Sequence, residues 1–495
     1  MQARSRQFGH TKSAISRWFR AASVVVLLVS AITRPGRAQS SALAGTGQPS
    51  LPVSDINSVQ NPFQGSVSSG PAAPQTLQLS LQDALEKGLH YNLAVLLNEE
   101  SSRASRGQRW QALSHLLPHL TTTTMTGKRL VNLYAIGFPT TIRSINPISG
   151  PFNVFDARAY VSGPLLNFQA LRNEKAASDE VEAAGYTYQD ARNVVVLVTS
   201  NAYLLAVASQ AEVQSAEAQV ATAKALYEQA VDRYNSGFSP EIDTLRAHVE
   251  LQSREQHLIA ARNDERTAKL NLARVIGLPD GQQFDLSTPE SFQPLPETEY
   301  AKALSEALAN RADYKAAEAE VRAAEARRRA IVAERYPSLG FAGDFGDAGF
   351  SPPFSHDTFT IAATLNIPVF QGGKVRGELI QADAQLKKAQ DQLNNLKGQI
   401  SYDVRTALMN IETAAEQVAV AKSNVALARE TLAQAKDRYA SGVTDNIEVI
   451  QAQDALAGAD DAYIASLYQH NVAKVALARA LGNAEHTVLQ YVGGK

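Results

Sequence analysis

Of the residues in this sequence that could do chemistry, two histidines have the spacing closest to that of a metal-binding pair. His115 and His119 are four residues apart, which on a helix would direct both imidazoles at one metal ion. Pro118 lies between them and would break such a helix, so we do not expect the pair to bind a metal. The other histidines are scattered along the chain and suggest no ligand set.

Two glycine-containing segments also lack the residues that a catalytic motif needs. "GFAGDFGDAG" at 340–349 is not followed by the Lys-Ser/Thr of a phosphate-binding loop. "GFSPE" at 237–241 lacks the second glycine of a nucleophile elbow. The run Arg327, Arg328 and Arg329 is typical of a solvated helix face. We therefore expect no catalytic residue, no cofactor and no metal, and a protein that is not an enzyme.

The N-terminus has the pattern of a secretory signal peptide. Basic residues from Arg4 to Arg20 precede the apolar run 21–32, and "GRAQS" follows, so we predict a signal peptide at 1–38. Residues 39–76 are rich in Ser, Gly and Pro and predict a flexible leader. The alternative is a cytosolic protein with a chance apolar patch. A net charge of −2 gives no reason to expect nucleic acid as a partner. The chain has no cysteine, so we expect neither disulfides nor a lipid-acylated cysteine.

The chain consists of two copies of one long unit. A shift of 205 residues places 233–277 on 438–482, and 15 of these 45 positions are identical. A period this long indicates a duplicated half-structure and not a solenoid. We predict a first repeat at 77–280, a linker at 281–298, a second repeat at 299–485 and a tail at 486–495.

Each repeat is predicted to contain two long helices joined by a tight turn. Apolar and small residues alternate at spacings of three and four from Ala206 to Tyr234, and again from Ile411 to Tyr439. This heptad pattern predicts helices that supercoil left-handedly and run about 75–95 Å. Gly237 and Gly442 can adopt the left-handed conformation that ends a helix, so each marks a hairpin tip. The expected helices are 170–236, 240–276, 374–440 and 445–482. A soluble coiled-coil scaffold remains the alternative.

Four segments between the helices alternate with period two and predict strands. In "DTFTIAATLNIPVF" the apolar residues Phe359, Ile361 and Leu365 lie on one face and threonines on the other. Ten-residue strands with one apolar face are typical of transmembrane β-barrels. Gly372 and Gly373 follow and would let the chain bend from strand into helix. The expected strands are 119–132, 152–166, 337–347 and 358–369. The alternative is a soluble hairpin packed on the helices.

The number of strands predicts the assembly. A sheet in lipid must close, because unpaired edge groups are costly there, and four strands cannot close. Two copies would give eight strands and a barrel filled by its own side chains, whereas three copies give twelve strands and an open lumen. We therefore predict a mainly α fold with a small β part: a trimeric 12-stranded transmembrane β-barrel, continued by a long periplasmic α-helical coiled-coil barrel.

These features resemble the outer membrane factor (TolC-like) family of outer membrane efflux proteins. The resemblance covers roughly 77–485 and rests on "LSLQDALEKGLHYNLAV", "YPSLGF", "LNIPVFQGGKVRGEL" and the two "RYxSG" tips. It implies a homotrimeric exit duct in the outer membrane, with helices in the periplasm. The implied partners are outer membrane lipid, a periplasmic adaptor (membrane fusion protein) and an inner-membrane pump of the proton-driven or ABC type. Small-molecule efflux is the expected function, and type I protein secretion or an extracytoplasmic scaffold are the alternatives.

The resemblance also implies a gate at the hairpin tips. Counting from the tip glycines, Tyr439 and Asp243 match the tyrosine and aspartate positions that latch the channel in this family. Thr444 stands where well-known members carry an arginine, so neutral hydrogen bonds or Asp445 are expected to hold the closed state. Glu448 matches one position of an acidic ring that would favour cations. The alternative for Glu448 is an ordinary exposed helix residue.

Overall fold

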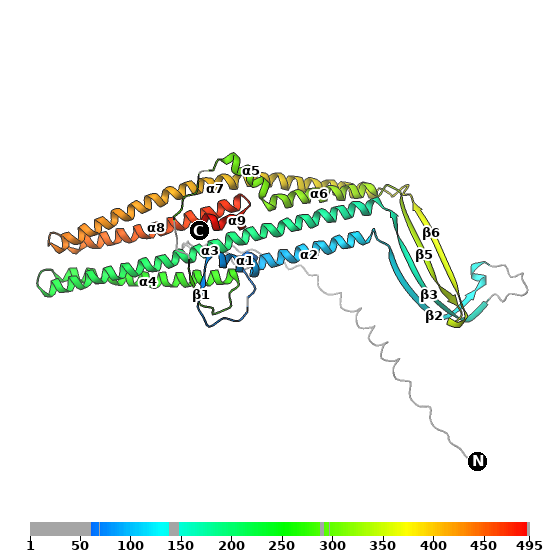
Figure 1. The fold of residues 1–495 in the computed structure, drawn as a ribbon, viewed down its shortest axis with the longest axis horizontal. Coiled ribbons are helices and arrows are strands. Elements are labelled where there is room, and N and C mark those ends of the chain that lie inside the picture. Colours follow the sequence, from blue (N-terminus) through cyan, green and yellow to red (C-terminus); the bar gives the residue numbers. More distant parts are fainter. Residues whose placement is uncertain (1–60, 69, 138–147, 288–291, 297, 493–495) are drawn as a thin grey trace, which may run out of the picture. The chain divides into compact units, whose positions relative to one another are not determined.

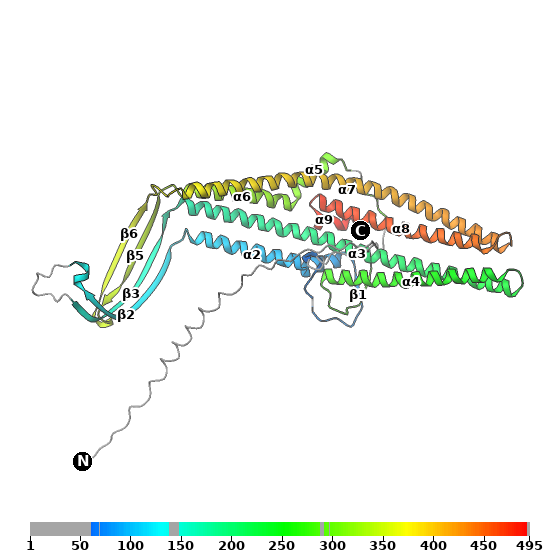
Figure 2. The same cartoon turned by 180° about the vertical axis from the view of Figure 1, so that it is seen from behind.

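The computed structural model describes residues 61–68, 70–137, 148–287, 292–296 and 298–492. The expected signal peptide and residues 39–60 of the expected leader lie outside the described residues. Everything described belongs to one unit, 59–495. Helices run along this unit, with a four-stranded sheet at one end and two helical hairpin tips at the other (Figures 1 and 2).

The duplication predicted from the sequence is visible as two successions of the same elements. The first is β1 (Leu77–Leu79), α1 (Leu81–Tyr91), α2 (Leu93–Ser114), β2 (His119–Asn132), β3 (Ile148–Leu166), α3 (Phe168–Asn235) and α4 (Glu241–Ile276). The second is β4 (Phe284–Leu286), α5 (Tyr300–Asn310), α6 (Ala312–Ala333), β5 (Ser338–Gly349), β6 (Ser355–Asn366), α7 (Lys374–Ala440) and α8 (Asn446–Ala480). A last helix, α9 (Ala484–Val492), follows. Short 3-10 turns are η2 (Pro62–Gln64), η3 (Leu133–Ile136) and η4 (Pro352–Phe354).

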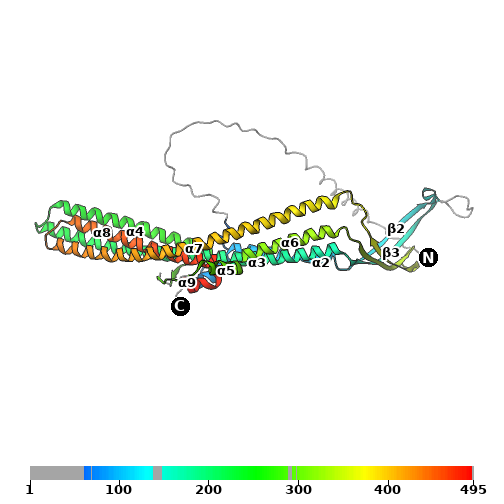
Figure 3. The ribbon, with the colours of Figure 1, turned by 90° about the horizontal axis from the view of Figure 1, so that it is seen from above.

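The two longest helices pack along the seams that the heptad pattern predicts. α3 has 68 residues and α7 has 67, so each extends about 100 Å. On α3 the small seam residues Ala206, Ala216 and Ala230 are at most 1% exposed, which lets neighbouring helices approach closely. Figure 3 shows the hairpins α3–α4 and α7–α8 running side by side toward the tips. Of the described helices, α3 alone contains a segment apolar enough to cross a membrane, and 61% of that segment is buried within the chain.

The four predicted strands form one antiparallel sheet in the order β2-β3-β5-β6. β6 ends at Asn366, three residues before the expected 369, since Pro368 has no N–H to continue the ladder. β3 begins at Ile148 instead of 152, and β5 runs to Gly349 instead of 347. Within the described chain, β2 and β6 each pair on one side only, so both outer edges of the sheet are open.

Three expectations about the connecting segments were wrong in part. The leader was expected to be flexible to residue 76, but residues 61–68 pack on the helices, where the Val67 N–H donates to the Tyr91 carbonyl at 2.8 Å. The expected linker contains β4, which pairs with β1 in parallel. The expected tail is mostly α9, which buries Ala484 and Val488. These pieces are three to nine residues long, too short to show a period in the sequence.

Candidate gate at the helical hairpin tips

Both tips end their first helix in the same way. The Gly237 N–H donates to the Tyr234 carbonyl at 2.9 Å, and the Phe238 N–H to the Arg233 carbonyl at 2.8 Å. Gly442 and Val443 repeat this pattern one repeat later. It is a Schellman cap, which needs a left-handed residue after the helix. Gly237 and Gly442 supply it with φ of 78° and 75°.

The two hairpins of one chain pack against each other behind these turns. Leu226 and Ala230 of α3, Ala247 of α4, and residues of α7 and α8 form a small apolar cluster there. Tyr439 belongs to this cluster and is 2% exposed, whereas its equivalent in the first repeat, Tyr234, is 44% exposed. The duplicated tyrosines are therefore used differently: one is buried between the hairpins and the other faces outward.

Arg233 joins the first hairpin to the second. Its Nη1 donates to the Tyr439 carbonyl at 3.0 Å, and its guanidinium lies over the Tyr439 ring, 4.8 Å from the centroid. Burial raises the pKa of Tyr439, while the positive charge of Arg233 opposes that shift and the Asp243 carboxylate adds to it. In the described structure the Tyr439 hydroxyl has no hydrogen-bond partner, so no bond joins it to Asp243. The first hairpin instead contacts Tyr439 through Arg233, a residue that the sequence analysis did not single out.

Asp243 lies at the second contact between the hairpins. Its backbone carbonyl accepts from Asn446 Nδ2 at 2.6 Å, and its carboxylate is 3.5 Å from Arg246 Nη1. Arg246 Nη1 is also 3.9 Å from the Asp445 carboxylate of the other hairpin. Burial raises the pKa of Asp243, which is 4% exposed, and Arg246 opposes that shift. Asp243 and Asp445 therefore share one arginine across the hairpin boundary.

Glu448 and Thr444 lie on the second hairpin, and within the described residues neither side chain makes a hydrogen bond or ion pair with the first. Glu448 Oε1 is 3.2 Å from Arg438 Nε, and the Glu448 side chain is 41% exposed. Thr444 is half-buried, and in the described residues its side chain makes no polar contact with another element. A shift of 205 residues relates Asp243 to Glu448 and Arg233 to Arg438. In each pair the first-repeat residue joins the hairpins, and the second-repeat residue stays on its own hairpin.

Several buried polar atoms at the tips lack a partner within the described chain: Arg233 Nε, Ser239 Oγ, Thr244 Oγ1, Tyr439 Oη and Asn446 Oδ1. An unsatisfied buried polar group costs about 1–3 kcal/mol. The tip packing is therefore only partly satisfied in one protomer, which lowers the cost of separating the hairpins there.

The opposite end of the helices bends at the predicted glycines. Gly372 and Gly373 have φ of 58° and 84° and connect β6 to α7. Lys374 opens α7, and its ammonium group is 3.1 Å from the carboxylate of Glu334, the residue that ends α6. The start of α7, directly after the bend, is thus tied by an ion pair to the residue that caps α6.

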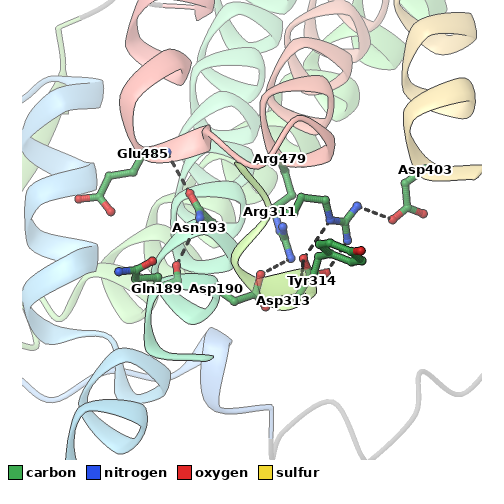
Figure 4. Close-up of polar contacts among 9 residues, drawn as sticks. All are labelled: Gln189, Asp190, Asn193, Arg311, Asp313, Tyr314, Asp403, Arg479 and Glu485. Carbon is green, nitrogen blue, oxygen red and sulfur yellow. Dashed lines mark hydrogen bonds and ion pairs between the residues drawn. The ribbon is translucent and has the colours of Figure 1, made fainter. Parts of the chain in front are cut away.

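A buried network at mid-length, about 50–70 Å from the tips along the helices, ties the hairpins together (Figure 4). Arg311, which is 5% exposed, donates to Asp313 at 2.6 Å and to Asp403 of α7 at 3.0 Å. Arg479 at the end of α8 donates to Asp190 of α3 at 2.6 Å. The backbone N–H of Glu485 in α9 donates to Asn193 Oδ1 at 3.2 Å. The helices are therefore anchored here, whereas the tips are held by fewer polar contacts.

The contacts at the tips and at mid-length join helices to one another. No cluster of three or more His, Asp or Glu suited to a metal ion exists among the described residues. His119 begins β2, and His115 follows the last residue of α2, so the two histidines do not share a helix.

Comparison with known proteins identifies the family. The outer membrane efflux protein family matches residues 89–278 and 303–483, one match on each repeat, so the chain belongs to that family. No curated protein matches the sequence. Family membership makes the chain an outer membrane efflux channel whose helices extend into the periplasm. The family is one of ducts and not of enzymes.

Solved structures share the fold. A membrane protein from Pseudomonas aeruginosa superposes with a TM-score of 0.71 at 19% identity, covering 90% of this chain and 99% of that one. The outer membrane protein VceC of Vibrio cholerae gives 0.70 at 19% identity, with 81% and 96% covered. The CmeC outer membrane channel of Campylobacter jejuni gives 0.69 at 18% identity, with 88% and 94% covered.

Proposed function

We propose that three copies of the chain form a passive exit duct for small molecules, closed by a 12-stranded barrel in the outer membrane. The observation that carries this proposal is the open four-stranded sheet. β2 and β6 are 14 and 12 residues long and have unpaired outer edges in the described chain. Each unpaired backbone group in lipid costs several kcal/mol, so the edges must meet those of further copies. Three copies give the smallest barrel with a water-filled lumen.

The outer helices support lateral assembly of the same kind. α2, α4 and α7 lie at the edges of the helical layer, since α3, α6 and α8 pack between them. These outer helices carry large apolar side chains that are more than half exposed: Leu97 and Trp110 on α2, Ile259 and Leu270 on α4, and Tyr402 and Leu427 on α7. Such side chains are expected to be covered by neighbouring protomers.

Cross-linking tests the proposed trimer, and the absence of native cysteine gives a clean background. Thr122→Cys on β2 and Ala363→Cys on β6 would place thiols on the two open edges. A thiol cross-linker should give a ladder of species that ends at three chains. The matched control is Thr122→Cys with Ala159→Cys, which are directly opposed within one chain and should give no ladder. A ladder that ends at two chains, or no ladder with the edge pair, would contradict the trimer.

The proposed duct works with a periplasmic adaptor and an inner-membrane pump, proton-driven or ABC, which supply the energy. The duct itself uses neither a cofactor nor a metal. Deleting the gene should raise intracellular accumulation of small toxic compounds and leave secretion of proteins unchanged. The opposite pattern, with lost secretion of a protein and normal drug accumulation, would favour type I secretion instead.

At the tips, we assign the latch to the contacts of Asp243, Tyr439 and Asp445, and the acidic ring to Glu448. Thr444 contributes no charge. Three Glu448 carboxylates around one narrow bore would favour cations, and Arg438 partly neutralises each of them. In planar bilayers Glu448→Gln should lower the cation preference about twofold, and Arg438→Gln should raise it. If both variants keep the ion selectivity of the wild type, Glu448 is an ordinary exposed residue and forms no selectivity ring.

A further inference from the structure

The polar face of the sheet carries a compact charged cluster. The guanidinium of Arg158 on β3 bonds to Asp156 at 3.2 Å, to Asp344 on β5, and to Thr358 Oγ1 on β6 at 2.9 Å. The side chains of Arg158 and Asp344 are 16% and 15% exposed. One arginine therefore spans three of the four strands, and the cluster is a built feature of the sheet.

The register explains how one side chain reaches so far. Arg158 lies directly opposite Gly346, and Thr358 lies opposite Gly346 on its other side. A Cβ at Gly346 would lie 2.9 Å from the Cβ of Arg158, closer than real Cβ contacts. The missing side chain at Gly346 leaves the space over which the guanidinium crosses to β6. Asp344, two residues along β5, is on the same face as Gly346 and accepts a hydrogen bond from the Arg158 guanidinium there.

The opposite face of the same strands is apolar and exposed. Phe345, Phe359 and Ile361 alternate with the polar positions and are 63%, 73% and 84% exposed. In a barrel that spans lipid, this apolar face must point outward. The face with Arg158 then lines the lumen, a conclusion that rests on the proposed trimeric duct.

The charges of the cluster do not cancel. One guanidinium against two carboxylates leaves one net negative charge in each protomer. Arg129 lies on the same face, six residues along β2 from Thr123, the residue opposite Arg158, and four from Met125, the residue opposite Asp156. These separations are about 20 Å and about 13 Å, both longer than the Debye length of about 10 Å at 0.1 M salt. We propose that Arg158, Asp156 and Asp344 of three protomers form a cation-favouring ring inside the barrel, separate from the periplasmic tips.

The test is the reversal potential of single channels under a KCl gradient at pH 8. Asp344→Asn retains an oxygen that accepts from Arg158, so the strands stay tied while the net charge of the ring becomes zero. We expect the cation-to-anion permeability ratio to fall about twofold at 0.1 M salt, and less at 1 M, where screening is stronger. Asp156→Asn should give the same change, and Arg158→Gln the opposite one.

The matched control is Asp347→Asn, the same change three residues along β5. Asp347 is opposite Ala157 and Asp357, on the outward face, and its substitution should leave the ratio unchanged. Conducting trimers whose ratio is unchanged in both Asp344→Asn and Asp156→Asn would overturn the ring. The ring would also be overturned if Asp347→Asn changed the permeability ratio as much as Asp344→Asn does. A wild-type protein that forms no conducting trimer would instead refute the proposed function.

Discussion

Single residues decide how the two hairpins of one chain are joined. Arg233 contacts both the carbonyl and the ring of Tyr439, whereas its equivalent Arg438 pairs with the exposed Glu448. We predict that Arg233→Ala weakens the closed tips by about 1–2 kcal/mol and raises single-channel conductance or open time. Arg438→Ala removes an exposed ion pair, worth about 0–1 kcal/mol, and is the matched control for open time, although it should raise the cation preference as Arg438→Gln does. Equal conductance in wild type and Arg233→Ala would exclude this role.

A buried histidine in the second repeat makes stability depend on pH. Lys269 of the first repeat pairs with Glu265 at 2.9 Å, but the equivalent Lys474 has His470 at the glutamate position. His470 is 1% exposed, packs on Phe292 and has no hydrogen-bond partner for either ring nitrogen in the described structure. Burial, and secondarily the charge of Lys474, lower the pKa of His470 to about 4.

Because His470 has different pKa values in the folded and unfolded chain, protonation of His470 is linked to unfolding. The folded-state pKa lies below the unfolded value of about 6.5, so the unfolded chain binds the extra proton first as pH falls. The contribution of neutral, buried His470 to the free energy of unfolding is therefore fully present above about pH 6.5. It is lost progressively toward pH 4, by up to about 3 kcal/mol. His470→Gln should flatten the fall in melting temperature over this range. His248→Gln, the same change at an exposed position, should not.

At the scale of elements, alanine substitutions at two glycines of the second hairpin are expected to change the stability in opposite directions. Gly442 has φ of 75°, where an alanine is strained, so Gly442→Ala should destabilise the tip by about 1–2 kcal/mol. Gly458 lies inside α8, is exposed, and has nothing within 4 Å of a built Cβ. Gly458→Ala should therefore stabilise the helix by about 0.5–1 kcal/mol. Thermal unfolding in detergent measures both, and shifts of the same sign would contradict the assignment of the tip.

Seams of nine positions and strands of about ten residues in the sequence predicted α3, α7 and the four-stranded sheet. β1, β4 and α9 were missed because each is shorter than the window that a period needs. The helices α1, α2, α5 and α6 were also not predicted, although α2 and α6 have 22 residues each. At the tips, residue type was enough to find Gly237 and Gly442, since only a left-handed cap fits there.

The joining residues of the gate were missed for a different reason. Arg233 and Asn446 bond to groups about 200 residues away in the chain, and such partners follow only from the packing of the hairpins. The identity of Arg233 and Arg438 across the two repeats was the available signal. It marked both arginines as equivalent but could not indicate which one crosses to the other hairpin.

At the scale of the whole molecule, the two faces of the sheet should tolerate charge unequally. Ile361 and Thr360 are neighbours on β6 and point to opposite faces. Ile361→Lys places a charge in lipid at a cost of about 2–4 kcal/mol near the midplane, so we expect little heat-modifiable trimer in outer membranes. Thr360→Lys faces the lumen and should assemble normally. Normal assembly of both variants would argue against a lipid-spanning sheet.

The unequal use of duplicated residues has a consequence for how the proposed duct can widen. A ring of six identical half-chains would have six equivalent boundaries and could part at any of them. Here alternate boundaries are internal to a chain, where Arg233 and Asn446 fasten the hairpins at the tips and Arg479 of α8 bonds to Asp190 of α3 farther up. The remaining three boundaries exist only between chains. Dilation of the bore by separation at those three boundaries would leave every polypeptide internally intact.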